Sequence, residues 1–251
     1  MNASLQKGLD LLEHFLGHRE RLSLAEISRI SGVPKATAYR LLEPFVLYGF
    51  LVKDEGGYSL GLRFLEFAAR VDQRLVLRRV ALPIMERLRN EVDEAVQLAV
   101  LEGDEAVYIE KVDSHRPIRL YTQVGRRAPL HAAACPRVLL AYGPPEVRER
   151  VLAASHSWQA YTPTTVTDPA RVLELLAQIR RTGWSVSRGE LAEGSVAVAV
   201  PIMGAGNRAM AALSVAGPAD RIPDERFPEL VELLTRSAAD IEKAAGYLRH
   251  E

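Results

Sequence analysis

Apolar residues recur at helical spacing from the start of the chain. Four leucines follow one another at intervals of four, three and four, namely Leu5, Leu9, Leu12 and Leu16. This spacing predicts an amphipathic helix with the leucines on one apolar face, because residues three and four apart lie on one side of a helix.

Two shorter helices are predicted next, joined by a glycine turn. Ser23 and Glu26 have the spacing of a capping box, and Gly32 suits the end of that helix. Pro34 suits the first position of a third helix, which Pro44 is expected to kink or interrupt. The residues expected to be buried are Leu24, Ile27 and Ile30 in the second helix, and Ala38, Leu41, Leu42 and Phe45 in the third.

A hairpin is predicted after these helices, with strands at 50–52 and 58–60 and a turn at 54–57. Helix, turn, helix and hairpin together indicate a winged helix-turn-helix, which places the start of its third helix in the major groove of DNA. A solvated face of a small packing domain is the alternative interpretation of the same residues. We expect DNA contacts from Ser23, Ser31, Lys35, Ala36, Thr37, Tyr39, Arg40 and Lys53.

The charge of the chain bears on how it can bind DNA. Its 251 residues contain 32 Lys and Arg and 32 Asp and Glu, and residues 1–75 carry a net charge of only +1. Because non-specific affinity rests on neutralised phosphates, tight binding is expected to need two copies of the chain. The sequence has one cysteine, a start unlike a signal peptide and no apolar run of about 18 residues. These features predict a cytoplasmic protein that does not cross a membrane.

The motifs of this region and of the rest of the chain resemble the isocitrate-lyase-repressor (IclR) family of bacterial regulators. They include "SLAEISRISGVPKATAYRLLEPFVLYGFL", "VGRRAPLHAAACPRVLLA", "ELAEGSVAVAVPI" and "AALSVAGPADRI". The resemblance implies an N-terminal winged helix, a linker helix and a C-terminal GAF-like domain. It also implies dimers or tetramers on near-palindromic operator DNA, with a small organic effector as the signal.

The remainder of the chain predicts an α+β domain. A linker helix ends the first domain, 1–74, and a helix with a kink at Leu82–Pro83 begins the second, 75–251. Strands are expected at 95–113 as a hairpin, and at 118–125, 184–189, 196–203 and 209–217. Helices are expected at 136–142, 144–154, 168–182 and from 226 onward. Helices on one side of such a sheet are expected to leave a ligand cleft on the other.

Candidate chemistry in the second domain centres on His131 and Cys135, four residues apart. A thiol nucleophile with a base and half of a zinc site are two interpretations; a buried cysteine on an apolar wall is the third, and the one we adopt. We therefore expect no catalytic residue, no metal and no cofactor. An enzyme fused to a winged helix, and an oligomerisation module without a ligand, are the alternatives to an effector domain.

By resemblance, four segments line the effector pocket, and this chain departs from the family pattern within them. Pro136–Arg137 stands where relatives have Gly-Lys, and Gly189–Glu190 where they have an acidic pair. Ala197 and Ala216 replace a cysteine and a serine. With few polar donors, we expect a cavity of at least about 300 Å³ and an effector that is neutral or has a single polar end. The expected effector residues are Ala134, Cys135, Ser187, Glu190, Ser195, Ala197, Ser214 and Ala216.

Overall fold

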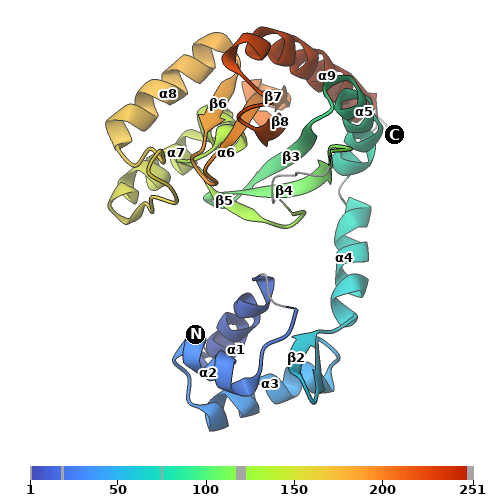
Figure 1. Ribbon diagram of the computed structural model, residues 1–251, viewed down its shortest axis with the longest axis vertical. Helices are drawn as coiled ribbons and strands as arrows, with labels where there is room; N and C mark the ends of the chain where they lie inside the picture. The colour runs from blue at the N-terminus through green and yellow to red at the C-terminus, as the bar shows by residue number, and fades with distance from the viewer. Residues whose placement is uncertain (1, 18–19, 75, 117–122, 248–251) are drawn as a thin grey trace. The chain divides into compact units, whose positions relative to one another are not determined.

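The computed structural model describes residues 2–17, 20–74, 76–116 and 123–247. The chain divides into two compact units, Met1–Leu75 and Val76–Glu251 (Figure 1). Each unit has its own hydrophobic core, so each is described by itself below.

The first unit is a winged helix-turn-helix. Its helices are α1 (Ala3–Glu13), α2 (Leu24–Ser31) and α3 (Lys35–Leu47), followed by the antiparallel hairpin of β1 (Leu51–Asp54) and β2 (Gly57–Leu60). Helix α4 (Arg63–Arg74) comes after the hairpin. The core residues of this unit come from every element before α4: Leu11, Phe15, Leu22, Ile27, Ala38, Leu42, Leu51 and Tyr58.

The apolar face predicted for the first helix is largely exposed, although its Leu12 packs against the core. Leu5 and Leu9 are 59% and 51% exposed, and Leu16 lies beyond the end of α1. The buried face is formed instead by Gly8 and Leu11. At Gly8, an added Cβ would lie 3.3 Å from the Phe45 ring, so glycine lets α3 approach closely here.

The third helix begins one residue later than expected, and Pro44 does not interrupt it. Pro34 precedes α3 as its N-cap, with extended ψ, and the helix begins one residue later at Lys35. Pro44 lies within α3, which continues as one helix to Leu47. The predicted burial of α3 is confirmed for Ala38 and Leu42. In α2, Ile27 is buried and Leu24 packs half-buried against the core, whereas Ile30 is 41% exposed.

The second unit is built on a six-stranded antiparallel sheet of order β5-β4-β3-β8-β7-β6. Its strands are β3 (Ala95–Glu102), β4 (Glu105–Val112), β5 (Arg127–Pro129), β6 (Ser185–Arg188), β7 (Ser195–Met203) and β8 (Ala209–Pro218). Its helices are α5 (Val76–Val92), α6 (Ala134–Tyr142), α7 (Pro145–Ala153), α8 (Pro169–Thr182) and α9 (Phe227–Tyr247). Most of the strand predicted at 118–125 lies outside the described residues, and α5 runs through Pro83 as one helix.

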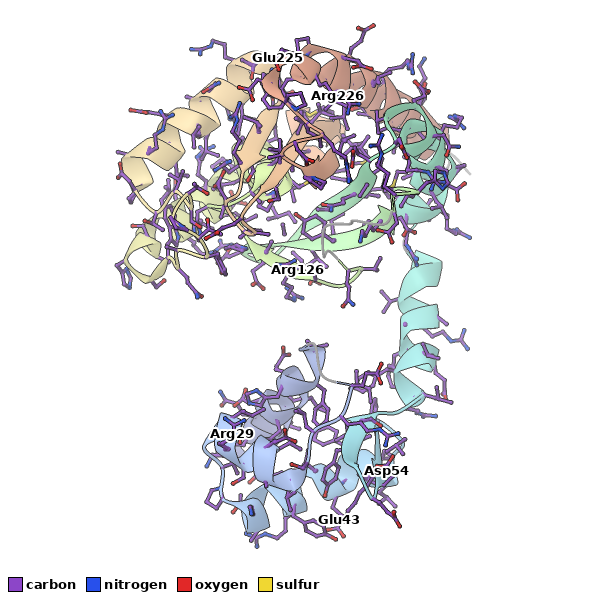
Figure 2. The ribbon with its side chains drawn as sticks, in the orientation of Figure 1. Arg29, Glu43, Asp54, Arg126, Glu225 and Arg226 are labelled. Atoms are coloured by element: carbon purple, nitrogen blue, oxygen red, sulfur yellow. The ribbon has the colours of Figure 1, made fainter. Side chains whose placement is uncertain are left out.

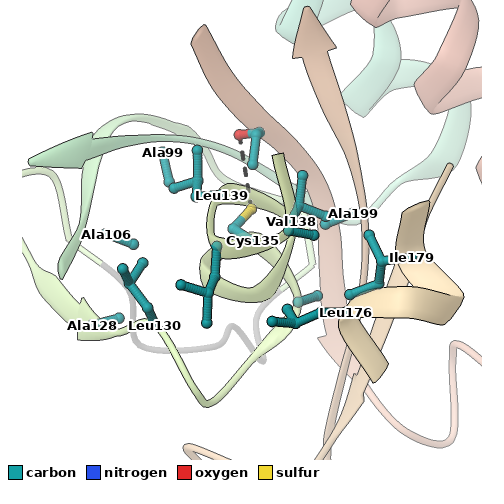
Figure 3. Packing of buried hydrophobic residues seen from close by; sticks show 14 of the residues in the cluster. Ala99, Ala106, Ala128, Leu130, Cys135, Val138, Leu139, Leu176, Ile179 and Ala199 are labelled. Atoms are coloured by element: carbon teal, nitrogen blue, oxygen red, sulfur yellow. Dashed lines mark hydrogen bonds between the residues drawn. The ribbon is translucent and has the colours of Figure 1, made fainter. Parts of the chain in front are cut away.

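Helices cover both faces of this sheet, so the expectation of helices on one side is wrong. Ala99, Ala199 and Ala212 pack against α6 in a core that includes Cys135 (Figure 3). Residues next to them along each strand point to the opposite face, where α5 and α9 pack. The face toward α6 carries small side chains, and α6 can therefore lie close to the strands.

Candidate functional site

Short polar contacts hold both ends of α2. The backbone amide of Glu26 donates to Ser23 Oγ at 3.2 Å, and Ser23 N donates to Glu26 Oε2 at 2.9 Å, which confirms the capping box. Gly32 ends α2 with a φ of 70°, a conformation that favours glycine. Ser31 Oγ donates to the Ile27 carbonyl at 2.6 Å and accepts from Val33 N at 3.2 Å. The Ser23 hydroxyl thus caps the start of α2, and the Ser31 hydroxyl stabilises the turn that leads to α3.

The first two turns of α3 present a polar surface. Lys35, Ala36, Tyr39 and Arg40 are exposed, and Thr37 is half-buried. Figure 2 shows Glu43 of α3 and Asp54 of the hairpin at the surface of the same unit. Because Ala38 and Leu42 anchor the opposite side of α3 in the core, the exposed side chains are carried by a rigid helix.

The hairpin is tied to α3 by Lys53. Its Nζ lies 4.9 Å from the centroid of the Tyr39 ring and 5.8 Å from that of Tyr58, so the cation sits over aromatic faces. Tyr58 also forms a backbone bridge with Leu22, at 2.9 and 3.0 Å. Sequence reasoning missed Tyr58 in this role, although its pairing opposite Lys53 follows from the hairpin register.

Glycine is required where the hairpin meets the chain before α2. Gly57 has a φ of 122°, and a Cβ there would lie 2.6 Å from the Leu22 carbonyl oxygen. Arg21 pairs with Asp54 at 3.1 Å beside this contact. The hairpin is therefore held closely against the segment that precedes α2.

The second unit brings several expected effector residues onto one face of the sheet. Ser187 pairs with Ala197, and Ala197 pairs with Ala216, so the three lie side by side across β6, β7 and β8. Ser214 lies two residues from Ala216 along β8 and shares this face. We call Ser187, Ala197, Ser214 and Ala216 the small-residue row. Ser195 stands at the start of β7, half-buried.

Cys135 lies beneath this row, on α6. The Cys135 Sγ lies 3.8 Å from the Ala212 carbonyl oxygen (Figure 3). The preceding residue, Ala134, is also buried. Burial raises the pKa of the Cys135 thiol to about 12, a shift that a hydrogen bond with Ser214 partly offsets. The thiol is thus protonated at neutral pH and is poorly suited to act as a nucleophile.

His131 does not share a helix face with Cys135, because α6 begins only at Ala134. The imidazole of His131 instead stacks on the Trp158 indole, with ring centroids 4.6 Å apart. No group of three or more His, Cys, Asp and Glu side chains within the described ranges is placed to hold a metal ion. The geometry therefore favours the interpretation of Cys135 as a core residue.

Two of the departures from the family pattern form a buried ion pair. Arg137 Nη1 donates to Glu190 Oε2 at 2.6 Å, and Arg137 Nη2 donates to Glu190 Oε1 and, at 2.8 Å, to the Val186 carbonyl. Both side chains are at most 6% exposed. From the sequence alone, Arg137 and Glu190 were considered separately. Their opposite charges were the signal that could have predicted an ion pair between them.

Three threonines hold the turn that carries Glu190. Thr162 Oγ1 donates to the Gly189 carbonyl at 2.8 Å, and Thr165 Oγ1 donates to the Glu190 carbonyl at 2.6 Å. Thr164 Oγ1 reaches the Arg188 carbonyl at 3.0 Å. The turn between β6 and β7 is therefore fixed from two sides, by Arg137 and by these threonines.

Neither of two cavities formed by the described residues is lined by the small-residue row. One, of about 320 Å³, lies between α1 and α3 and is bordered by Arg40 and Pro44. The other, of about 260 Å³, lies beside His131. The predicted effector cavity at the row accordingly stays a prediction.

A capped helix-turn-helix with a polar α3 and a fixed wing defines a DNA-binding protein of the winged-helix class. Residues 4–55 match the IclR helix-turn-helix domain, and residues 69–243 match the family described as bacterial transcriptional regulator IclR C-terminal. The chain belongs to the IclR family of transcriptional regulators, which confirms the resemblance seen in its motifs.

Named relatives and solved structures agree with this assignment. The regulator KipR of Bacillus subtilis is 38% identical over 98% of both chains, and the repressor AllR of Escherichia coli is 31% identical over 98% of this chain and 92% of its own. An IclR homologue from Microbacterium hydrocarbonoxydans, solved with 4-hydroxybenzoate, is 35% identical with a TM-score of 0.81, covering 99% of this chain and 100% of its own. These relatives are regulators, so the chain is a transcription regulator and not an enzyme. No helix within the described ranges is long and apolar enough to cross a membrane.

Proposed function

We propose that this regulator binds near-palindromic operator DNA as a homodimer or homotetramer, and that a small organic effector in its C-terminal unit controls operator affinity. The observation that carries the DNA part is the exposed start of α3 beside Lys53 of the wing. The C-terminal unit is proposed to have the GAF-like role of binding the effector and joining the subunits.

Each exposed side chain of α3 has a proposed part in reading DNA. Lys35, at the free N-terminal end, suits a phosphate. Ala36 is small enough to touch a thymine methyl, and Arg40 can pair with guanine through two hydrogen bonds. Lys53 is proposed to contact the DNA backbone from the wing, with Tyr39 holding it in place.

Assembly of two copies is supported by charge and by exposed apolar side chains. A net charge of +1 over residues 1–75 provides little phosphate neutralisation in one copy. Leu5 and Leu9 of α1, and Leu65, Phe67 and Val71 of α4, are each more than half exposed. Exposed apolar side chains gathered on one element are typical of a surface that another chain covers.

We expect the purified protein to be at least a dimer at micromolar concentration, measured by light scattering. Tight binding should require an operator with two half-sites, because each winged helix neutralises few phosphates. DNA with one half-site scrambled serves as the control. A monomer in solution that binds a single half-site as tightly as the full operator contradicts the proposal.

The effector part of the proposal rests on the small-residue row. Three hydroxyls, from Ser187, Ser195 and Ser214, and the methyl groups of Ala197 and Ala216 come together on this face. The solved relative with bound 4-hydroxybenzoate supports a small ligand in this family. That ligand is an anion with two polar ends, whereas the few polar donors of the small-residue row favour an effector that is neutral or has a single polar end. Control of DNA binding requires the effector to bind one state of the protein more tightly than the other.

Replacing Ala197 with phenylalanine is expected to abolish the effector response and to leave DNA binding intact, because the two units have separate cores. The measurement is calorimetric titration of wild type and variant with 4-hydroxybenzoate and with any compound that co-purifies and is identified by mass spectrometry. Ala192→Phe, at an exposed position of the β6–β7 turn, is the control. Equal binding to wild type and Ala197→Phe places the pocket elsewhere. No binding to wild type favours a C-terminal unit that only joins subunits.

A further inference from the structure

A cleft apart from the small-residue row lies at the β4–β5 end of the C-terminal sheet. Its volume is about 260 Å³, and it opens between that end of the sheet and the segment from α7 to Tyr161. We call it the His131 cleft. Its apolar and aromatic walls come from Leu130, His131, Val151, Ala154, Trp158 and Tyr161.

One wall of the His131 cleft is a rigid aromatic stack. The rings of His131 and Trp158 are stacked, 6° from parallel. His131 is 2% exposed, and its Nε2 lies 3.4 Å from the Gln159 carbonyl oxygen. Burial lowers the pKa of His131, so the imidazole is neutral at neutral pH. Because His131 is buried behind its partner, the surface that the stack offers to the cleft is that of the half-buried Trp158 indole.

The charges at the rim of the cleft are already paired. Arg150 Nη2 and Nε donate to Asp104 Oδ1 at 2.6 and 3.1 Å, and Glu105 accepts from Arg127 Nη1 at 3.1 Å. Of the described residues that line the cleft, Arg150 alone has a permanent positive charge. A ligand carboxylate entering the cleft would therefore have to compete with Asp104, whereas an uncharged ligand would not.

We propose that the His131 cleft binds a neutral, single-ring aromatic molecule with one hydroxyl or amino group. An apolar cavity of about 150 Å³ can hold benzene, so 260 Å³ admits one ring and a substituent, and lies below the range of about 300–1,000 Å³ typical of larger ligands. The ring packs against the His131–Trp158 stack, where offset or edge-to-face contacts are favoured. The substituent donates to the Gln159 carbonyl, which has a second lone pair, or to the Tyr161 hydroxyl.

The first test uses phenol as the probe and Trp158 as the reporter. The chain has two tryptophans, so Trp184→Phe leaves Trp158 as the only one. Phenol is expected to change its fluorescence saturably. Benzoate, which brings a charge, and cyclohexanol, which has no aromatic ring, are expected to bind at least about 10-fold more weakly, because a carboxylate without a partner is costly to bury. Absence of a saturable change with phenol overturns the proposal, as does equal binding of all three compounds.

A matched pair of variants locates the site. Ala154→Phe fills the cleft and is expected to weaken phenol binding at least about 10-fold, whereas Ala153→Phe, its exposed neighbour outside the lining, is expected to change it less than about 2-fold. Equal affinity in the two variants overturns the assignment to this cleft. Operator binding is measured in parallel for the wild type and both variants. A wild type that does not bind operator DNA would refute the regulator proposal, whereas the cleft proposal is tested by the phenol titration alone.

Discussion

Glu190→Leu is expected to lower the free energy of unfolding of the C-terminal unit by about 3–5 kcal/mol, because it leaves the buried Arg137 guanidinium without its partner. Arg137→Met is expected to have a similar cost, since the Glu190 carboxylate then stays buried and unpaired. Both tryptophans, Trp158 and Trp184, belong to this unit, so urea unfolding followed by tryptophan fluorescence reports on it specifically.

The double variant separates the pair's attraction from the cost of burying its charges. Arg137→Met combined with Glu190→Leu is expected to be more stable than either single variant, because an apolar pair of similar volume needs no compensating charge. Asp224→Asn breaks an exposed ion pair with Arg188 and should leave the unfolding midpoint almost unchanged. If the double variant is as unstable as the sum of the two singles, the pair does not act as a unit.

Arg40→Ala is expected to weaken operator binding by about 1–3 kcal/mol and to relax sequence preference at one base pair of each half-site, because Arg40 is proposed to pair with guanine. The measurement is a fluorescence anisotropy titration at fixed salt, with the operator and with a scrambled duplex. Unchanged affinity together with unchanged sequence preference would remove Arg40 from the residues that read DNA.

Lys35→Ala is the matched comparison on the same helix. Loss of a phosphate contact is expected to weaken binding to the operator and to the scrambled duplex alike, and to reduce the slope of log affinity against log salt by about 1. The two variants are therefore distinguished by their affinity for the scrambled duplex, which Lys35→Ala lowers and Arg40→Ala lowers less, even if both lose the same affinity for the operator. Glu43→Ala, an exposed change on α3 that removes a negative charge, should not weaken binding.

Features that depend on neighbouring residues could be predicted from the amino-acid sequence. The capping box of Ser23 and Glu26, the glycine end of α2 and the hairpin turn after β1 each need contacts only a few residues apart. The order of the other strands and helices in the second unit was predictable for the same reason, although β5 was not predicted, and the motifs identified the family.

The tertiary structure decided which of several apolar residues are buried and which polar residues pair with one another. Leu5 and Leu9 lie on the apolar face that the helical spacing predicts, yet Leu11 faces the core, because the position of α3 determines which side of α1 is covered. Arg137 and Glu190 stand 53 residues apart, and their pairing follows from the sheet topology that brings the β6–β7 turn to α6. His131 stacks on Trp158 rather than sharing a helix face with Cys135, because α6 begins three residues after it. Such contacts depend on the path of the whole chain, which no local pattern of residues contains.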